Sequence, residues 1–205
     1  MADVVDLVRA YLHVNGYFTV SEYPLLEELR DGGHRTFTDL DVLAFRFPGA
    51  GPVSVTPARG LPLVPVLLEP DPVLGLTRGE ADMVVAEVKE GRAELNRGAR
   101  DPRVLEAALV RFGCCHPEEV RGLVDELLAS GSARAAAGHR IRLLAFGSSV
   151  PESGPRGYRA ITLGHVATFL REHMRSHWDV LRHAQVLDPA LGFLALLEKA
   201  ERGEG

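Results

Sequence analysis

Two short stretches of the sequence carry charged side chains that could do chemistry together. Residues 38–45 place Asp41 among apolar side chains, and residues 82–89 end in Glu87 and Lys89. Both stretches are short and rich in β-formers, so we expect strands rather than helices. Side chains alternate between the two faces of a strand, so Glu87 and Lys89 share one face. If the strands are neighbours, two carboxylates and an ammonium meet at the edge of the sheet, where they must pair or bind a cation.

Lys89 stands out because the chain uses arginine almost everywhere else. The sequence holds 21 arginines and two lysines, and the other lysine, Lys199, lies in the polar C-terminal tail. An ammonium is a compact charge that can lose its proton when buried, whereas a guanidinium stays charged. A lysine at position 89 is therefore typical of a site that positions water or handles a proton. The alternative is an ordinary ion pair between Glu87 and Lys89 at the end of a strand.

The arrangement resembles the signature of PD-(D/E)XK nucleases, the restriction-endonuclease-like superfamily that includes Holliday-junction resolvases and many repair nucleases. The resemblance rests on Asp41 in Leu40-Asp41-Val42-Leu43-Ala44 and on Glu87-Val88-Lys89 after the apolar run 83–86. It covers roughly the first half of the chain. An E-x-K tripeptide alone is common in soluble proteins. One that closes an apolar strand, after a strand with an embedded aspartate and a leading helix–strand unit, is more specific.

The resemblance implies metal-dependent hydrolysis of phosphodiester bonds in nucleic acid, with DNA as the expected partner. Asp41, Glu87 and the main-chain carbonyl of Val88 would hold Mg²⁺ or Mn²⁺, hard cations that suit oxygen ligands. The cation would polarise the phosphate and generate hydroxide, while Lys89 would orient the attacking water and offset developing negative charge. Glu22, which ends the strand before the Asp41 strand, is a weaker candidate for a further acidic ligand.

Two other interpretations stay open. The first is a catalytically inactive domain of nuclease fold that serves as an interaction module. The acidic net charge, the missing proline before Asp41 and the long segment between the two strands favour it. The second is an α/β protein unrelated to nucleases, in which the E-x-K tripeptide is a coincidence. A measured affinity for Mg²⁺ or Mn²⁺ separates the nuclease from both.

Length and composition set wider bounds. The chain has 205 residues and a formal net charge of −5 at pH 7. This length suits one domain with a sizeable core. The charge argues against a protein that coats nucleic acid through clustered lysines and arginines, although it leaves room for a local basic groove. Adjacent Cys114 and Cys115 are poorly placed for a disulfide with each other, and neither a basic leader nor a membrane-spanning apolar run is present. We therefore expect a cytoplasmic protein without a membrane partner.

Hydrophobic spacing and helix-end signals predict an irregular alternation of helices and strands. We expect an α/β fold with a mixed central sheet flanked by helices on both faces, and the resemblance implies a restriction-endonuclease-like core. Asp101, Pro102 and Gly113 mark the N-cap, first position and stop of one helix. The other helices are expected to follow Asp3 and Pro117, to begin at Gly164 and to cover Leu191 to Ala200. The strands are expected to cover 17–23, 38–45, 82–89, 141–147 and 158–163.

Three segments are expected to lie outside the core of a single domain spanning residues 1–205. Residues 48–76 are dense in proline and glycine, which excludes a helix and a central strand and predicts an insertion that packs over the sheet or offers a partner surface. Residues 164–205 are expected to form a helical C-terminal extension. Polar residues 25–35 are expected to form a mobile loop, which would leave His34 and Arg35 in solvent near the Asp41 strand.

Three further groups of residues favour structural roles. His116 and the neighbouring cysteines have the wrong spacing for a zinc site. Ser148-Ser149 lacks the nucleophile-elbow pattern of a hydrolase. His173 and His177 are one helical turn apart and could chelate a transition metal, but the commoner role is partial burial at a contact between helices or subunits. A homodimer therefore stays open.

Overall fold

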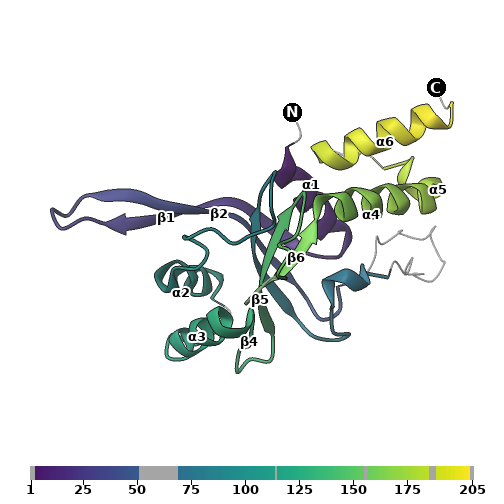
Figure 1. The fold of residues 1–205 in the computed structure, drawn as a ribbon. Helices are drawn as coiled ribbons and strands as arrows, with labels where there is room; N and C mark the ends of the chain where they lie inside the picture. Colours follow the sequence, from purple (N-terminus) through teal and green to yellow (C-terminus); the bar gives the residue numbers. More distant parts are fainter. Residues whose placement is uncertain (1–2, 51–68, 114, 155–156, 185–187, 204–205) are drawn as a thin grey trace.

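In the computed structural model of the chain, residues 3–50, 69–113, 115–154, 157–184 and 188–203 are described. They form a mixed six-stranded sheet with helices on both faces (Figure 1). This confirms the predicted α/β class. The elements in chain order are α1 (Val4–Val14), β1 (Phe18–Glu28), β2 (His34–Arg46), the 3-10 helix η1 (Pro72–Leu74), β3 (Asp82–Val88), α2 (Pro102–Phe112), α3 (Val120–Ser130), β4 (Ser132–Arg134), β5 (Arg140–Gly147), β6 (Arg159–Thr162), α4 (Leu163–Ser176), α5 (Trp178–Leu181) and α6 (Pro189–Glu201).

The sheet combines an antiparallel meander with a parallel crossover. Its strand order is β1-β2-β3-β5-β4, and β6 also pairs with β5. Strand β2 is antiparallel to both β1 and β3. Strands β3 and β5 run parallel and are joined through α2, α3 and β4. All seven residues of β3 are buried, which explains why this central strand has an almost continuous apolar sequence.

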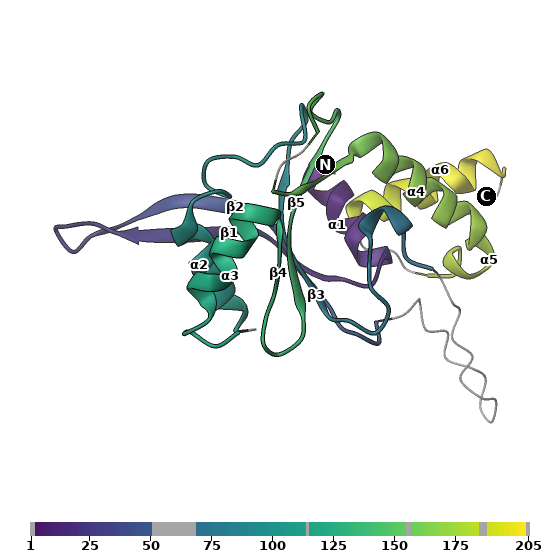
Figure 2. The same ribbon diagram turned by 60° about the horizontal axis from the view of Figure 1, so that its bottom comes forward.

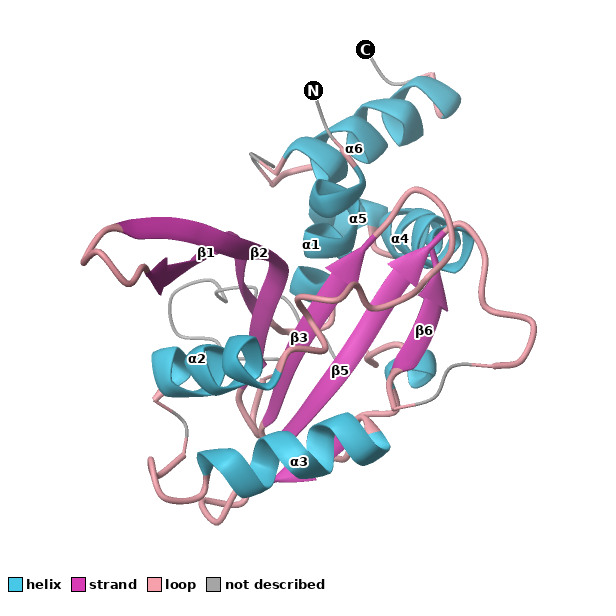
Figure 3. Ribbon diagram, turned by 60° about the vertical axis from the view of Figure 1, so that its left-hand side comes forward, coloured by secondary structure: helices cyan, strands magenta, loops and turns pink. Residues whose placement is uncertain are grey.

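Each face of the sheet carries its own hydrophobic core. Met83 and Val85 point towards the core that α2 and α3 cover, and Val84 and Ala86 point towards the core beneath α1, α4 and α6. Figure 2 separates these two helical layers on opposite sides of the strands, and Figure 3 shows α2 and α3 in front of the sheet. The strict alternation along β3 is the reason that a single charged residue can be assigned to one layer.

The helix ends lie within a few residues of the predicted positions, and the largest shift is at the start of α3. Asp101 caps α2 by accepting from the N–H of Arg103, and Gly113 ends this helix in the left-handed conformation, as predicted. The next helix, α3, begins at Val120, three residues after Pro117, and its N-cap residue Glu119 makes no side-chain hydrogen bond to the helix. The Glu119 carboxylate instead accepts from the N–H groups of His116 and Ala136.

Residues 25–35 correct the prediction of a loop, because most of them belong to a long hairpin arm. Strand β1 passes through Pro24 to Glu28 and pairs with β2 as far as His34, and the arm projects from the sheet in Figure 1. Proline is tolerated here because β1 is an edge strand. Arg35 pairs with Glu27 across the hairpin at 2.8 Å. The prediction was wrong because it took polar composition as the sign of a loop. A strand that projects into solvent needs few apolar side chains.

Part of the expected insertion 48–76 is described. Residues 51–68 lie outside the described residues, as does Cys114. After this gap, Asp71 caps η1 and accepts a hydrogen bond from the Tyr11 hydroxyl at 2.7 Å, and Leu74 is fully buried. This end of the insertion thus packs on the layer of α1 and α4. Among the helices of the described ranges, none combines the length and apolarity needed to cross a bilayer.

Candidate active site

The sheet opens at Asp41, where β2 stops pairing with β3. The ladder between these strands ends at the pair Val42 and Ala86, so the next position would set Asp41 opposite Glu87. Here the Asp41 side chain replaces the ladder, because its Oδ2 accepts a hydrogen bond from the Val88 N–H at 2.7 Å. The two carboxylates that the sequence singled out therefore lie on neighbouring strands at one point of the sheet.

Alternation gives the face on which they lie. Leu43 and Val85 both belong to the core that α2 and α3 cover. Asp41 and Glu87 stand two residues beyond them on their strands, so they belong on the same side of the sheet. The prediction that the two carboxylates share a face therefore agrees with the strand register.

The main chain of Val88 points into the same opening. The N–H of Val88 donates to Asp41, and in a strand the N–H and C=O of one residue point to the same side. The next N–H, that of Lys89, donates to the Phe146 carbonyl at 2.9 Å, on the opposite side. The Val88 carbonyl thus faces β2, as a ligand shared with Asp41 would require.

Glu87 is buried, with only 4% of its surface exposed, and its two carboxylate oxygens differ. Oε1 accepts from Asn96 Nδ2 at 2.6 Å and lies 3.3 Å from the Nζ of Lys89. Oε2 is buried and has no hydrogen-bond partner within the described part of the chain. The ion pair that the sequence allowed between Glu87 and Lys89 is therefore formed, yet it leaves half of the carboxylate unsatisfied.

Burial and like charge oppose ionisation at this site. Burial, followed by the charge of Asp41, raises the pKa of Glu87 to about 7, although Lys89 and Asn96 act in the opposite direction. Burial also raises the pKa of Asp41, against the hydrogen bond from Val88 and the charge of Lys89. A cation between the two carboxylates would remove the repulsion and satisfy the free oxygen.

The loop after β3 is held against the end of β5. The N–H of Ala93 donates to the Ser149 carbonyl at 2.8 Å, and the N–H of Ser148 donates to the Gly91 carbonyl at 2.6 Å. At Gly147 a side chain has no room, because a Cβ there would lie 2.7 Å from the Gly91 carbonyl oxygen and would also clash with Ala93. Ser148 donates its hydroxyl to the Glu90 carbonyl at 2.5 Å, which agrees with a turn serine.

Asn96 is the site residue that the sequence analysis missed. Its amide donates to Glu87, and its Oδ1 accepts from the Ala99 N–H at 2.7 Å. Asparagine commonly closes a turn onto its own following backbone. The segment Asn96-Arg97-Gly98 ahead of the Asp101 cap carried that turn signal, but nothing local to it indicated contact with a residue nine positions earlier.

Glu22 does not join a ligand cluster in this structure. It lies between the pairs Ser21–Val42 and Tyr23–Leu40, which places it opposite Asp41 in register, but its side chain is exposed. Within the described ranges, no three histidine, cysteine, aspartate or glutamate side chains are arranged to hold a metal ion. Among the same residues Glu22 is the one non-glycine with a positive φ, at 50°.

The rings of His173 and His177 lie against each other, tilted by 38°. Their ring centroids are 4.9 Å apart, and the Nδ1 of His177 lies 2.9 Å from the His173 carbonyl oxygen. Burial, helped by His177, lowers the pKa of His173 to about 4. A neutral, buried histidine in contact with a neighbouring ring matches the packing role expected from the sequence.

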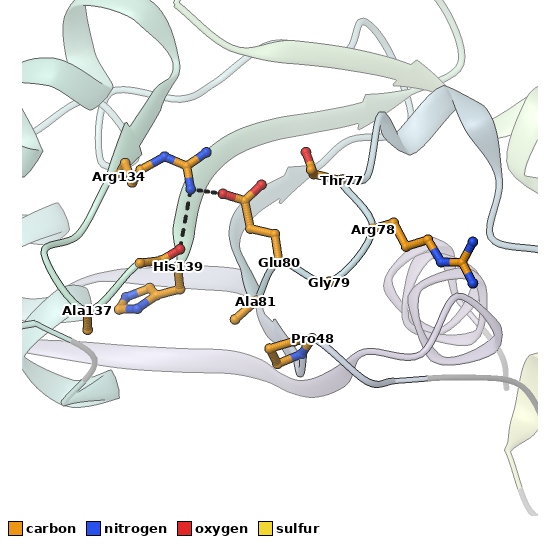
Figure 4. Close-up of a pocket in the computed structure, with 10 residues that line it drawn as sticks. Pro48, Thr77, Arg78, Gly79, Glu80, Ala81, Arg134, Ala137 and His139 are labelled. Carbon is orange, nitrogen blue, oxygen red and sulfur yellow. Dashed lines mark hydrogen bonds and ion pairs between the residues drawn. The ribbon is translucent and has the colours of Figure 1, made fainter.

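A hollow of about 450 Å³ lies at the opposite end of β3 and does not include the site residues. In Figure 4, Arg134 reaches over Glu80 and the two side chains form an ion pair. The Nε2 of His139, another lining residue, is buried without a hydrogen-bond partner inside the described ranges. The lining of the hollow holds two arginines, Arg78 and Arg134, against the single carboxylate of Glu80, so it does not repeat the carboxylate pair found at the other end of the strand.

Comparison with models of protein families, with curated proteins and with solved structures finds no match to this chain. The donor set itself fits a divalent cation. Two carboxylates and the Val88 carbonyl supply hard oxygen ligands, and the buried Oε2 of Glu87 is an acceptor without a hydrogen-bond partner among the described residues. Mg²⁺ commonly uses one or two carboxylates and completes its shell with water and substrate phosphate, so three acidic side chains are not required.

Proposed function

We propose that this protein is a Mg²⁺- or Mn²⁺-dependent nuclease with a restriction-endonuclease-like core. The observation that carries the proposal is the buried Glu87 Oε2, which has no partner among the described residues although Asp41 stands beside it. Buried carboxylate oxygens without a partner are rare and costly in folded proteins. A bound cation would explain why the buried Oε2 of Glu87 has no hydrogen-bond partner among the described residues.

The order of elements supports the same class. A helix, an antiparallel meander with the aspartate on its second strand, and an E-x-K sequence at the end of its third strand follow one another. The resemblance to PD-(D/E)XK nucleases rests on the same order of helix, embedded aspartate and E-x-K tripeptide. The resemblance to that superfamily and the nucleic-acid substrate remain parts of the proposal.

Each site residue has a role that its position allows. Asp41, Glu87 and the Val88 carbonyl would hold the cation, which when bound would polarise a phosphodiester and activate water. Lys89 is 36% exposed at its side chain, so its ammonium can reach both Glu87 and a substrate phosphate. Its charge offsets the negative charge that develops on the phosphate.

DNA is the proposed substrate, and the loop after β3 offers cations for its backbone. Arg92, Arg97 and Arg100 are exposed on this loop close behind Lys89. Phosphate contacts of this kind give affinity without sequence preference.

An inactive interaction module is the second candidate, and one observation favours it. Arg103, near the arm, is already paired with Asp101 at 2.8 Å and with Glu27 at 3.4 Å. Paired arginines contribute less to phosphate binding than free ones. A module of this kind would keep the fold and lose the cation affinity.

Calorimetric titration with Mn²⁺ and Mg²⁺ tests the proposal. The parent protein should bind the cation, while Asp41→Asn and Glu87→Gln should lose measurable binding and keep the fold. Glu94→Gln is the matched control, because this carboxylate lies in the same loop, is 46% exposed and pairs with Arg92. Equal binding by the parent and Glu87→Gln would contradict the proposed site.

Cleavage of single-stranded, duplex and branched DNA and of RNA then separates the two candidates. Lys89→Arg should bind the cation like the parent but lose most cleavage, because guanidinium is larger, planar and unable to transfer a proton. A parent that binds no cation and cleaves none of these substrates would leave the interaction module as the better account.

A further inference from the structure

Asn96 lies between the proposed cation ligand and the start of α2. We infer that Asn96 is a positioning residue, which holds Glu87 so that Oε1 is occupied and Oε2 stays free for the cation. This inference rests on the proposed function, because it assigns a role towards the same cation.

The two carboxylate oxygens of Glu87 differ in their hydrogen-bond partners. Asn96 Nδ2 donates to Oε1 at 2.6 Å, and the Lys89 ammonium lies 3.3 Å from the same oxygen. Both donors therefore act on one side of the carboxylate. Without Asn96, the carboxylate could turn about its terminal bond at little cost, so that neither oxygen would be held at the position that Oε2 occupies. A fixed donor removes this freedom before the cation arrives.

Asn96 can serve as a fixed donor because the other end of its side-chain amide is also hydrogen-bonded. Its Oδ1 accepts from the Ala99 N–H at 2.7 Å. The turn that follows packs tightly against β2, since a Cβ on Gly98 would lie 2.6 Å from the Thr38 hydroxyl oxygen. The carbonyl of Gly98 in turn accepts from the N–H of Asp101, the cap of α2, at 2.9 Å. The amide is thus tied both to the strand that carries Asp41 and to the helix that covers the site.

Groups that orient a metal ligand through a hydrogen bond typically change metal affinity 10- to 100-fold when they are removed. Asn96 uses its two ends for different tasks, so two substitutions separate them. Asn96→Ser keeps a hydroxyl that can accept from Ala99 in a similar turn, but it is too short to reach Glu87. Asn96→Gln keeps an amide donor long enough for Glu87 but loses the geometry of the turn.

The experiment is calorimetric titration of the full chain with Mn²⁺, with melting temperatures recorded in chelator. We expect Asn96→Ser to lower Mn²⁺ affinity about 10-fold or more with a small change in melting temperature, and Asn96→Gln to retain affinity closer to that of the parent. Loss of affinity in Asn96→Gln but not in Asn96→Ser would show that only the turn matters and would overturn the inference. Parent-like affinity in both variants would overturn it as well.

The same titration distinguishes this inference from the proposed function. If the parent binds Mn²⁺ and Glu87→Gln does not, the proposed site stands, and the Asn96 variants decide the inference on their own. If the parent binds no Mn²⁺, the proposed function and the inference fall together.

Discussion

Strand β3 carries a buried carboxylate near each end, and the two are treated in opposite ways. Asp82, 2% exposed, accepts from Arg142 at 2.5 and 2.8 Å, from Arg140 at 3.1 Å and from the Tyr17 hydroxyl. Glu87, 4% exposed, has Asn96 and a half-exposed Lys89 on one oxygen and no partner for the other within the described chain. The two carboxylates are therefore similarly buried, but among the described residues Asp82 has hydrogen-bond partners for both of its oxygens and Glu87 for only one.

This is the difference that we expect between a structural carboxylate and the cation ligand that we propose. Asp82 points to the layer of α1 and α4, where Arg142 also donates to the Leu74 carbonyl and so ties the end of the insertion to the sheet. A complete network of this kind specifies packing. Glu87 lies on the other face, where the protein tolerates repulsion between two carboxylates that a cation would relieve. Functional sites commonly sacrifice stability in this way.

The largest effect is expected at the satisfied end. Asp82→Asn should lower the free energy of unfolding by roughly 3–5 kcal/mol, because it leaves the buried Arg142 without a counter-charge. Urea unfolding measures this loss. The double variant Asp82→Asn with Arg142→Met should lose less than the sum of the single variants, since it removes both charges. A loss below about 1 kcal/mol would show that the two ends of β3 do not differ as described.

At the unsatisfied end the effect should have the opposite sign. The pKa of Glu87 is raised from 4.5 to about 7, so the folded protein binds this proton more tightly than the unfolded chain. The stabilisation from that proton is present below pH 4.5 and is lost as the pH rises through about 7. In chelator, Glu87→Gln should therefore gain on the order of 3 kcal/mol relative to the parent at pH 8 and little at pH 4.

Urea unfolding of the parent, Glu87→Gln and the control Glu94→Gln across this pH range checks the sign. The control should follow the parent at every pH. Destabilisation of Glu87→Gln at pH 8 would instead identify Glu87 and Lys89 as an ordinary structural ion pair.

Gly147→Ala should affect the Glu87 end alone. The added Cβ would press on the Gly91 carbonyl and on Ala93, so we expect a loss of roughly 1–3 kcal/mol in stability together with weaker Mn²⁺ binding. Gly164→Ala is the matched control, because a Cβ at Gly164 meets no atom within 4 Å. If Gly147→Ala binds Mn²⁺ as tightly as the parent does, the packing of the loop after β3 against β5 does not determine the geometry of the cation site.

The smallest effect is expected from Tyr17→Phe. It removes one donor from Asp82 but leaves both arginines in place, so the loss should be about 1 kcal/mol. Cation affinity should not change, since Tyr17 belongs to the layer on the opposite face. Weaker Mn²⁺ binding in this variant would mean that the two ends of β3 are coupled.

Local patterns predicted much of this fold because they act over short stretches of chain. Asp101, Pro102 and Gly113 fixed the ends of α2, and alternation assigned Glu87 and Lys89 to one face of a strand. Local patterns failed where the environment was decisive. The arm of β1 and β2 looked like a loop because solvent surrounds it, and β4, with three residues, is too short to carry a period.

The sequence by itself determined which residues could form the site, since the E-x-K tripeptide and the embedded Asp41 are local features. Only the tertiary structure decided that β2 and β3 are neighbours across the intervening 48–76 segment and that β2 leaves the ladder at Asp41. It also decided that Asn96 joins Lys89 on Oε1 of Glu87. It likewise decided that Asp82 meets Arg142, 60 positions away. Contacts between residues far apart in the sequence depend on how whole helices and strands pack. The periodicity of one segment does not indicate which distant residue will contact it.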